Sequence, residues 1–580
     1  MKTNQQMMAA DKSENAPIPS SGQAQNNLEK DHFGSTTLAT ILLIALLLVL
    51  AAFRPLALPD EGRYAEIGRW MAQSGDWLAP RLNGLPFFHK PPLLYWLEGA
   101  VSQLMSPFAW SLRLIPAFHA ALILALMGPV LKKLLGPTVA IRSVVIFGSS
   151  AAFLLGGQYI NHDMMVASWI SVAITAFGYF VIQVARLLES GLQIQAERFK
   201  SLRQTAWIGF AACGLGVLSK GLIGVVLPGL VLLIWLCWSG KWQTLKVVPW
   251  ISGTTVFLVI ALPWFVLAEH AYPGMLDYMF GVHQFERFTG KQFNNAQPFW
   301  FYGAAISLLL GPWMIWFWAY QVRKILDFFT KNVGSGVLGA LRLVGLQFNP
   351  SKQRLRSDDQ LFVGLLLIWV WVIVVFFSIP NSKIIGYVLP VTPPMAVLCA
   401  LGWERLIGAV RYEKFIWRSF LLVSVVLLVG INYQAARLTR RHFSEDVAVA
   451  LKCQDLKNAQ IMVLGEYPYD LPFLISFDRP LWVIQDWDFE RMHAGDNWRR
   501  ELFEGANFEP SKGDSLKSLD TLSAQAGVSN RWLLAPKNSD RLVQVRNLGY
   551  QLVKEGSAWN LYRTLSTRDE LVNNSGNCRP

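Results

Sequence analysis

The sequence predicts a mainly α-helical, polytopic membrane protein with a soluble α/β domain at its C-terminal end. Hydrophobic residues make up 53% of the 580 residues and charged residues only 16%, which departs from the composition of soluble proteins. Apolar runs recur along most of the chain, each close to the roughly 20 residues that cross a bilayer. After about Ser444 the apolar runs become short and are bounded by turn residues, as in an α/β domain.

The N-terminal segment is polar and rich in Ser, Asn and Gln, so it buries too little apolar surface to fold. We therefore expect residues 1–35 to be a disordered cytoplasmic tail. The chain does not open with a short apolar segment and a small-residue cleavage site, so Thr37 to Phe53 is interpreted as an uncleaved first span. The transmembrane domain is predicted over residues 36–433.

Apolar segments of the right length are candidates for transmembrane helices. They are 37–53, 111–131, 138–159, 164–185, 205–219, 221–238, 247–268, 300–320, 360–379, 385–403 and 415–433. With the N-terminus inside, the basic loops fall consistently on the inner side, and we expect about 11 to 13 membrane helices. The piece Leu93 to Leu104 is too short to cross and should lie at the interface. Residues 54–110 then form an outer, periplasmic loop.

The excess of 52 Lys and Arg over 39 Asp and Glu sits in short loops between apolar runs. This placement indicates topology determinants, not a nucleic-acid surface. Three of the five cysteines lie in apolar segments, and none has metal-ligand spacing. Cys453 and Cys578 lie outside the predicted membrane part, where they form either a disulfide or two unpaired thiols.

The C-terminal part, residues 434–580, is predicted to be a periplasmic α/β domain. Its strand candidates are "AQIMVLGEY", "RPLWVIQDW", "RWLLAPK", "YQLVKEG" and "WNLYRTL". The sequence contains no P-loop, no dinucleotide fingerprint and no internal repeat.

Charged side chains gather on the predicted outer face. The first outer loop carries Asp60, Glu61, Arg63 and Lys90, and other outer turns carry Asp163, Lys220 and Lys383. Any one of them fits a capping carboxylate or a snorkelling lysine as well as a functional role. Together they indicate a polar cavity, because ionisable groups at the membrane edge are costly. A carboxylate can orient or deprotonate a nucleophile while cations neutralise a phosphate leaving group, which suits group transfer from a lipid phosphate.

The stretch "PDEGRYAEIGRWMAQSGDWLAPRLNGLPFFHKPPLLYWL" resembles the first extracytoplasmic loop of the bacterial aminoarabinose transferases of lipid A, within the superfamily of protein O-mannosyltransferase-like membrane glycosyltransferases. The motifs "SLRLIPA", "NHDMM", "LSKG", "LPWF", "FWFY" and "SKIIGYVLPVTPP" resemble later landmarks of that family in the same order. The resemblance covers most of residues 37–405.

The resemblance implies a membrane-embedded glycosyltransferase of the C-type fold, in the bacterial inner membrane with its site facing the periplasm. It implies an inverting transfer of 4-amino-4-deoxy-L-arabinose from a polyprenyl-phosphate donor, undecaprenyl phosphate, to lipid A. By matching motifs, the implied catalytic residues are Asp60, Asp163 and Lys90. The implied substrate-binding residues are Glu61, Arg63, Tyr64, His89, Arg113, Lys220, Lys383 and Tyr387.

One position departs from the family pattern, which has Glu before Lys-Pro-Pro where this chain has His89. His89 is either an exposed polar residue before the Pro-Pro turn without a role in the site, or a functional one. In the functional case the imidazole could hydrogen-bond there, add a positive charge beside Lys90, or join His270 or Glu269 around a divalent metal, the one cofactor the sequence suggests.

The sequence leaves the acceptor and the class of protein open. A lipid A phosphate is already anionic and would leave the carboxylates to orient groups, whereas a hydroxyl on another glycan or on protein would need Asp60 as a base. A lipid or sugar transporter also places charge among membrane helices, and a non-catalytic anchoring protein is a further class. The appended soluble domain and the clustering of charge on one face favour the enzyme.

Overall fold

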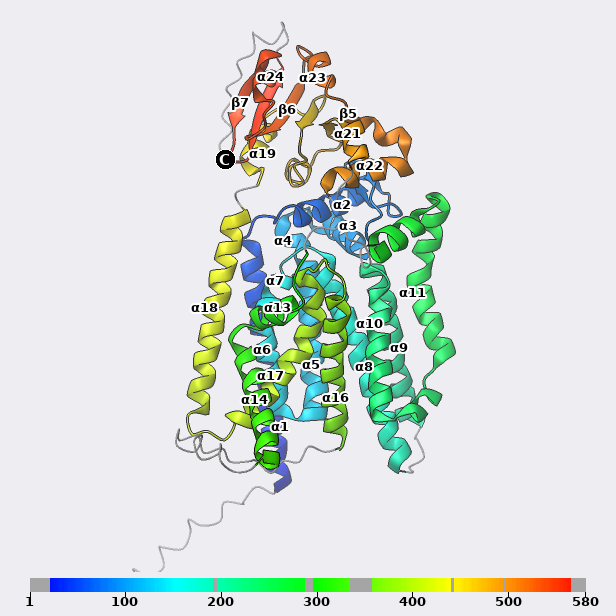
Figure 1. Ribbon diagram of the computed structural model, residues 1–580, viewed down its shortest axis with the longest axis vertical. Coiled ribbons are helices and arrows are strands. Elements are labelled where there is room, and N and C mark those ends of the chain that lie inside the picture. The colour runs from blue at the N-terminus through cyan, green and yellow to red at the C-terminus, as the bar shows by residue number, and fades with distance from the viewer. Residues whose placement is uncertain are drawn as a thin grey trace, which may run out of the picture.

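The computed structural model describes residues 21–190, 196–286, 296–333, 357–439, 443–493 and 497–564. Long helices stand side by side in a bundle, and an α/β domain caps one end of it (Figure 1). Within the described part, seven helical segments are long and apolar enough to cross a membrane. They are Ala109–Leu135, His162–Ser190, Trp250–Ala271, Phe301–Asp327, Asp359–Ser378, Ile385–Leu406 and Glu413–Thr439. The chain is a multi-pass membrane protein.

Each predicted span corresponds to helix in the structure. The bundle contains α1 (Ser21–Ala52), α5 (Leu114–Leu135), α6 (Pro137–Gly148), α7 (Ala151–Gly156), α8 (His162–Ser190), α9 (Ala196–Lys220), α10 (Ile223–Ser239), α11 (Trp250–Ala271), α13 (Phe301–Leu310), α14 (Met314–Val333), α16 (Ser357–Ser378), α17 (Thr392–Leu406) and α18 (Glu413–Thr439), with the 3-10 segments η1 (Trp242–Lys246), η3 (Gly311–Trp313) and η4 (Ile385–Val391) and the π-helical η2 (Asp277–Glu286).

Three predicted spans are interrupted. The span 138–159 divides into α6 and α7, the span 300–320 divides at η3, and the span 385–403 begins with η4. Pro312 and Pro390 lie in the two 3-10 segments, and a proline cannot donate the backbone hydrogen bond that a continuous α-helix needs.

Two predicted boundaries differ from the structure. Helix α1 begins at Ser21, so residues 21–35 of the expected disordered tail are helical, and residues 1–20 lie outside the described part. A polar segment can extend a helix once the apolar turns have nucleated it. Helix α18 continues to Thr439, past the predicted end at residue 433.

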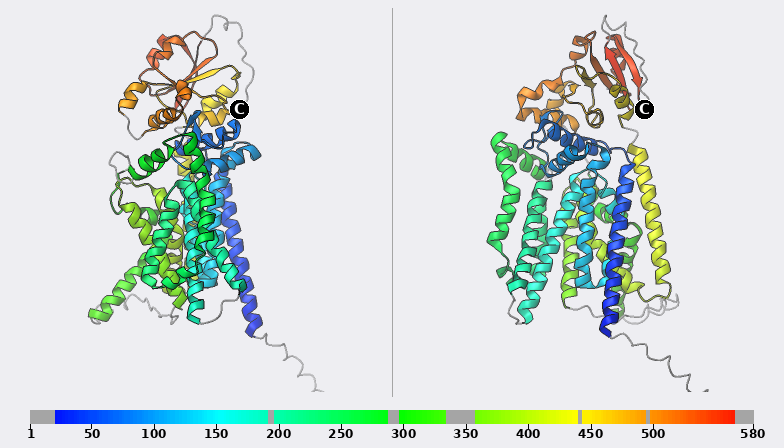
Figure 2. Two further views of the ribbon diagram at one scale, coloured as in Figure 1. Left: turned by 90° about the vertical axis from the view of Figure 1, so that its right-hand side faces the viewer. Right: turned by 180° about the vertical axis from the view of Figure 1, so that it is seen from behind.

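The first outer loop is folded. It contains α2 (Asp60–Ser74), the short strands β1 (Arg81–Leu82) and β2 (Leu85–Pro86), α3 (Leu93–Met105) and α4 (Ala109–Leu112). As predicted for Leu93 to Leu104, α3 does not stand with the bundle helices. Together with α2 it runs across the end of the bundle, beneath the α/β domain (Figures 1 and 2).

Helices α2 and α3 approach each other closely because of a glycine. A Cβ added to Gly68 would clash with the Cβ of Glu98 on α3. The absence of a side chain at Gly68 thus lets α2 and α3 pack closely, and the site described below begins at the first residue of α2.

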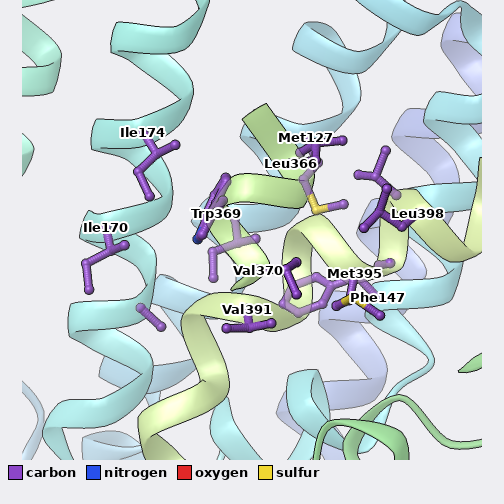
Figure 3. Close-up of a cluster of buried hydrophobic side chains, with 14 of the residues drawn as sticks. Met127, Phe147, Ile170, Ile174, Leu366, Trp369, Val370, Val391, Met395 and Leu398 are labelled. Carbon is purple, nitrogen blue, oxygen red and sulfur yellow. The ribbon is translucent and has the colours of Figure 1, made fainter. Parts of the chain in front are cut away.

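The bundle core is apolar and is built from distant parts of the chain. Figure 3 shows Met127 of α5, Ile170 of α8, Trp369 of α16 and Met395 of α17 converging on one another. These side chains are buried, and their packing holds together helices whose outer faces meet lipid.

The C-terminal domain contains a six-stranded sheet in the order β5-β4-β3-β6-β8-β7. Strands β5, β4, β3 and β6 pair parallel in that order, and β8 pairs antiparallel with β6 and β7. The strands are β3 (Gln460–Leu464), β4 (Trp482–Ile484), β5 (Leu516–Lys517), β6 (Arg531–Pro536), β7 (Tyr550–Glu555) and β8 (Trp559–Thr564). The helices are α19 (Glu445–Lys452), α20 (Leu471–Ile475), α21 (Trp487–Met492), α22 (Trp498–Phe508), η5 (Pro510–Ser515), α23 (Thr521–Ala524) and α24 (Leu542–Asn547). All five strand predictions are confirmed, and the two-residue β5 was too short to predict.

The α/β domain shares its core with the outer loop. Tyr64 and Leu82 of the loop belong to the same buried cluster as Val447 and Ile461 of the domain. Apolar burial therefore joins the loop and the domain into one unit at the outer end of the bundle.

Cys453 is disulfide-bonded, and the described cysteines in the helical bundle, Cys213, Cys237 and Cys399, are free. Cys578, the partner that the sequence suggested, lies outside the described residues, so this pairing stays a prediction.

Asp470 connects the start of the domain to its interior. Its Oδ2 accepts a hydrogen bond from the Ser444 backbone N–H at 2.6 Å, and Oδ1 accepts one from the Ser444 hydroxyl at 3.0 Å. Burial raises the pKa of Asp470 from 3.8 to about 6, although the Ser444 hydrogen bonds oppose the shift. The folded chain therefore holds this proton more tightly than the unfolded chain does.

We predict that Asp470 makes stability fall with rising pH between about pH 4 and 6, by up to about 3 kcal/mol, because only the folded state still binds the proton in that window. Melting temperatures of the detergent-solubilised protein at pH 4 to 7 test this. Asp470→Asn should remove this part of the pH dependence, and Asp478→Asn, an exposed aspartate in the same domain, should leave it intact. Parallel pH curves for wild type and Asp470→Asn would contradict the assignment.

Candidate active site

Asp60 is the first residue of α2 and faces partly into solvent. The hydroxyl of Tyr159 donates a hydrogen bond to its Oδ2 at 3.1 Å, and its Oδ1 forms an ion pair with Arg63 one turn later. About a third of the Asp60 side chain, 34%, is exposed. The carboxylate is thus oriented by two partners and remains accessible to a substrate.

Glu61, the next residue, lies in a different environment from Asp60. It is fully buried and forms ion pairs with Arg54 at 2.9 Å and Arg113 at 3.0 Å. It also accepts hydrogen bonds from the backbone N–H of Ala57 at 2.6 Å and of Ile160 at 3.0 Å. Burial disfavours the charged form, but the guanidiniums of Arg113 and Arg54 outweigh it and lower the pKa of Glu61.

Arg113 also contacts the end of the first span. Its guanidinium donates to the carbonyl of Ala51 at 2.8 Å and of Pro55 at 2.9 Å, in addition to Glu61. Glu61 and Arg113, which the family resemblance placed among substrate-binding residues, therefore connect α1, α2 and α5. Their contacts form a buried structural junction next to Asp60.

Asp163 lies in the first turn of α8, where two other predicted residues meet it. It forms an ion pair with Lys220 at the end of α9, and the Lys220 ammonium lies 4.6 Å from the ring centroid of Tyr387 in η4. Asn161 donates to Asp163 Oδ2 at 3.0 Å. Gly386 allows this approach, because a Cβ there would clash with the Asp163 carboxylate.

The short segment 159–163, which leads into α8, brings the carboxylates of Asp60 and Asp163 together. Tyr159 binds Asp60 and Ile160 binds Glu61, while Asp163 follows only a few residues later. The Tyr64 ring packs edge-on against the His162 ring, with centroids 4.9 Å apart. Burial raises the pKa of Tyr64, the charge of Arg63 opposes this shift, and the charges of Asp60 and Asp163 add to it. The Asp60 and Asp163 groups are therefore parts of one site.

His89 and Lys90 approach this site from the loop after β2. His89 stacks on Phe87, with centroids 4.5 Å apart, and its Nε2 lies 2.8 Å from the Tyr278 hydroxyl. Lys90 is half-buried, and its positive charge acts on His162, the neighbour of Asp163.

The α/β domain contributes residues that the sequence did not single out. Glu501 of α22 forms an ion pair with Arg63, and the Tyr469 hydroxyl donates to the same carboxylate at 3.0 Å. Glu504 accepts a hydrogen bond from Tyr278, and its Oε2 lies 3.9 Å from His89 Nε2. The α/β domain thus places the carboxylate of Glu504 beside residue 89.

Arg63 is the centre of the contact between the loop and the domain. Its guanidinium lies between Asp60 and Glu501 and over the rings of Tyr64, at 5.0 Å, and Tyr469, at 5.6 Å. Burial disfavours its charge, yet Glu501, and to a smaller extent Tyr64 and Asp60, raise the pKa of Arg63 above its usual value. Arg63 stays charged, so the Glu501 carboxylate helps to place the partner of Asp60.

Lys383 and His270 do not meet the other predicted residues. The Lys383 ammonium donates to the carbonyls of Gln297 at 2.9 Å and Pro380 at 2.8 Å, so it closes the turn after α16. His270 is exposed near the end of α11, and the adjacent Glu269 accepts from two backbone N–H groups at 2.8 Å. Among the described residues, no three His, Cys, Asp or Glu side chains are placed to hold a metal ion. The residues suggested for a metal therefore do not fit one here.

Comparison with known proteins places this geometry in a wider context. Residues 37–279 match the family described as dolichyl-phosphate-mannose-protein mannosyltransferase. The crystal structure of ArnT from Cupriavidus metallidurans bound to undecaprenyl phosphate superposes with a TM-score of 0.70 at 20% identity, covering 92% of this chain and 98% of that one. The chain has the ArnT fold.

Curated relatives agree with this match. An undecaprenyl phosphate-α-4-amino-4-deoxy-L-arabinose arabinosyl transferase 1 of Sodalis glossinidius is 27% identical over 64% of this chain, and one of Pseudomonas savastanoi pv. phaseolicola is 28% identical over 63%. The match spans 60% of the length of each of these relatives. The resemblance indicated by the motifs is confirmed, and within the ArnT fold the site lies where the outer loop meets the bundle.

We predict that Glu61→Gln destabilises the protein, because the loss of its charge leaves Arg54 and Arg113 buried with an uncompensated charge. Breaking such a buried pair costs about 3–5 kcal/mol. The melting temperature of the solubilised protein should fall well below that of wild type, while Glu445→Gln, an exposed glutamate in the first turn of α19, should melt normally. A stable Glu61→Gln protein that fails only to bind its substrate would restore a substrate role for this residue.

Proposed function

We propose that the chain is an inverting glycosyltransferase that moves 4-amino-4-deoxy-L-arabinose from undecaprenyl phosphate to lipid A, on the periplasmic face of the bacterial inner membrane. The single observation that carries the proposal is that the short segment 159–163 brings the Asp60–Arg63 pair and the Asp163–Lys220 pair together at one end of a membrane bundle. The ArnT fold and the names of the curated relatives support the choice of sugar and lipid carrier.

The donor's two halves suit the two environments of the site. The polyprenyl tail is apolar and would lie in the membrane among the helices. The phosphate would lie near Lys220 and Lys90, whose positive charges can offset the negative charge that grows on a departing phosphate. Lys220 is held by Asp163 and Tyr387, so this charge is in place before the donor arrives.

In the proposed reaction, an acceptor oxygen bonds to C1 of the sugar from the face opposite the phosphate. The bond between C1 and the phosphate oxygen breaks, its electron pair leaves with undecaprenyl phosphate, and the configuration at C1 inverts. An anionic lipid A phosphate needs no base, so Asp60, held by Tyr159 and Arg63, would orient the reacting groups and stabilise positive charge developing on the sugar ring. A hydroxyl acceptor would instead give its proton to Asp60.

Transfer to a hydroxyl on another glycan or on protein is the second candidate, because the exposed Asp60 carboxylate could act as that base. Transport has less support, since α2, which carries Asp60 and Arg63, lies at the end of the bundle beneath the α/β domain and not at its middle (Figure 1).

The test of the function is transfer by the purified protein in detergent. Undecaprenyl-phosphate aminoarabinose and lipid A should yield a lipid A species heavier by one aminoarabinose in mass spectrometry, together with free undecaprenyl phosphate. Lipid A of unchanged mass would contradict the acceptor, and a donor that stays intact with every acceptor tried would contradict the enzyme.

We predict that Asp60→Asn abolishes transfer without loss of expression or melting temperature. The change removes a charge but little volume from a partly solvated position, so the fold should tolerate it. Initial rates of product formation, measured beside the melting curve, check this. A variant with near-normal rates would remove Asp60 from the chemistry.

Glu501→Gln should lower the transfer rate by about tenfold or more, because Arg63 loses the partner that holds it beside Asp60, and small misplacements of catalytic groups have large effects on rate. Glu509→Gln is the matched control, since Glu509 also links the domain to the loop, through Arg81 at 2.7 Å, but lies outside the Asp60 group. Equal losses in both variants would indicate that docking of the domain, not the position of Arg63, controls the rate.

A further inference from the structure

Two cavities open at the end of the bundle opposite the α/β domain, where α17 turns into α18 (Figure 1). One lies between α6 and the start of α18 and has a volume of about 240 Å³. The other lies along the turn 408–415 and has a volume of about 580 Å³. Both are lined by Glu413, Lys414 and Arg418.

The acidic groups at these cavities are already occupied. Arg142 of α6 forms ion pairs with Glu404 and, at 2.9 Å, with Glu413. The indole N–H of Trp403 also donates to Glu413 at 3.1 Å. Arg142 thus neutralises much of the negative charge beside the cavities.

The neighbouring cations have no such partners. Lys414 and Arg418 are one helical turn apart on α18 and line both cavities. In the part of the chain that the structure describes, neither forms an ion pair with a carboxylate. Arg411, in the preceding turn, lies over the ring of Tyr412, with its guanidinium 5.8 Å from the ring centroid. The cavities therefore present uncompensated positive charge.

An apolar stripe begins beside these cations and runs along the bundle. Phe415, Leu422, Val426 and Val429 are exposed on α18, and their spacing places them on one side of the helix. Tyr412 is exposed at the end of the stripe, where aromatic rings are enriched at membrane–water interfaces. A ligand with a phosphate at one end and hydrocarbon at the other would match both features.

We infer that Lys414 and Arg418 bind the phosphodiester headgroup of an anionic phospholipid, whose acyl chains lie along the α18 stripe. Phosphate oxygens match the unpaired cations, and the continuous apolar surface distinguishes a phospholipid from free phosphate. The site lies at the opposite end of the bundle from Asp60, so it is independent of the proposed reaction. Basic pockets between helices are known to bind such headgroups.

The test uses the full-length protein, purified in detergent and mixed with phosphatidylglycerol or phosphatidylcholine before native mass spectrometry. Wild type should retain phosphatidylglycerol in preference to phosphatidylcholine. The Lys414→Gln/Arg418→Gln protein should bind phosphatidylglycerol about thirtyfold more weakly, since each of the two charges contributes about 1 kcal/mol near a membrane surface. The matched control, Lys200→Gln/Lys246→Gln, removes two exposed charges that line neither cavity and should bind as wild type does.

Equal losses in the two double variants, or no loss in either, would overturn the site. So would full competition by millimolar inorganic phosphate, because the ligand would then be the free anion. If the double variant does not fold, Arg418→Gln alone should still weaken binding of phosphatidylglycerol, and Arg418→Lys should restore it.

Discussion

The buried carboxylate of Glu61 is the contact on which the outer end of this protein depends. It neutralises Arg54 and Arg113, and it accepts backbone hydrogen bonds from Ala57 and Ile160. A charge so far from water is tolerated only when it is paired and fully hydrogen-bonded. The end of α1, the start of α2, the start of α5 and the segment before α8 are therefore held in one arrangement.

The position of Asp60 follows from this junction. Because Glu61 points into the protein at the start of α2, Asp60 faces the edge of the site, where Tyr159 and Arg63 reach it. The same segment that binds Glu61 leads directly into Asp163. One buried, structural carboxylate thus helps to place the partly exposed Asp60 and the largely buried Asp163. The group that supports the fold is therefore separate from the groups proposed to act on a substrate.

The α/β domain belongs to the site as well as to the fold. It shares an apolar core with the outer loop, and α22 brings Glu501 to Arg63 and Glu504 close to His89. The loop alone would leave Arg63 without its second carboxylate. Any movement of this domain would consequently move the Arg63 guanidinium and change its contact with Asp60.

Much of the architecture could be predicted because its signals are local. Apolar runs identified every span, short apolar runs bounded by turn residues identified all strands of the α/β domain but β5, and the length of Leu93 to Leu104 indicated that it does not cross. The helix boundaries were less predictable: α1 extends back into a polar segment, and α18 extends beyond its apolar run. Helix ends depend on neighbouring turns and caps as much as on hydropathy.

The sequence by itself determined the membrane bundle, the charged outer loop and the candidate residues Asp60, Asp163 and Lys220. Charged residues beside apolar runs can be recognised in one sequence, and they stand out because a charge near a membrane is costly. Only the tertiary structure separated Glu61 and Arg113, which form a buried junction, from Asp60. It also showed Lys383 bound to backbone carbonyls and Glu501 next to Arg63. These roles are set by partners that lie 52 residues away for Glu61 and Arg113, 86 residues away for Lys383 and Gln297, and 438 residues away for Arg63 and Glu501. A hydrogen bond between distant segments leaves no pattern in the local order of residues.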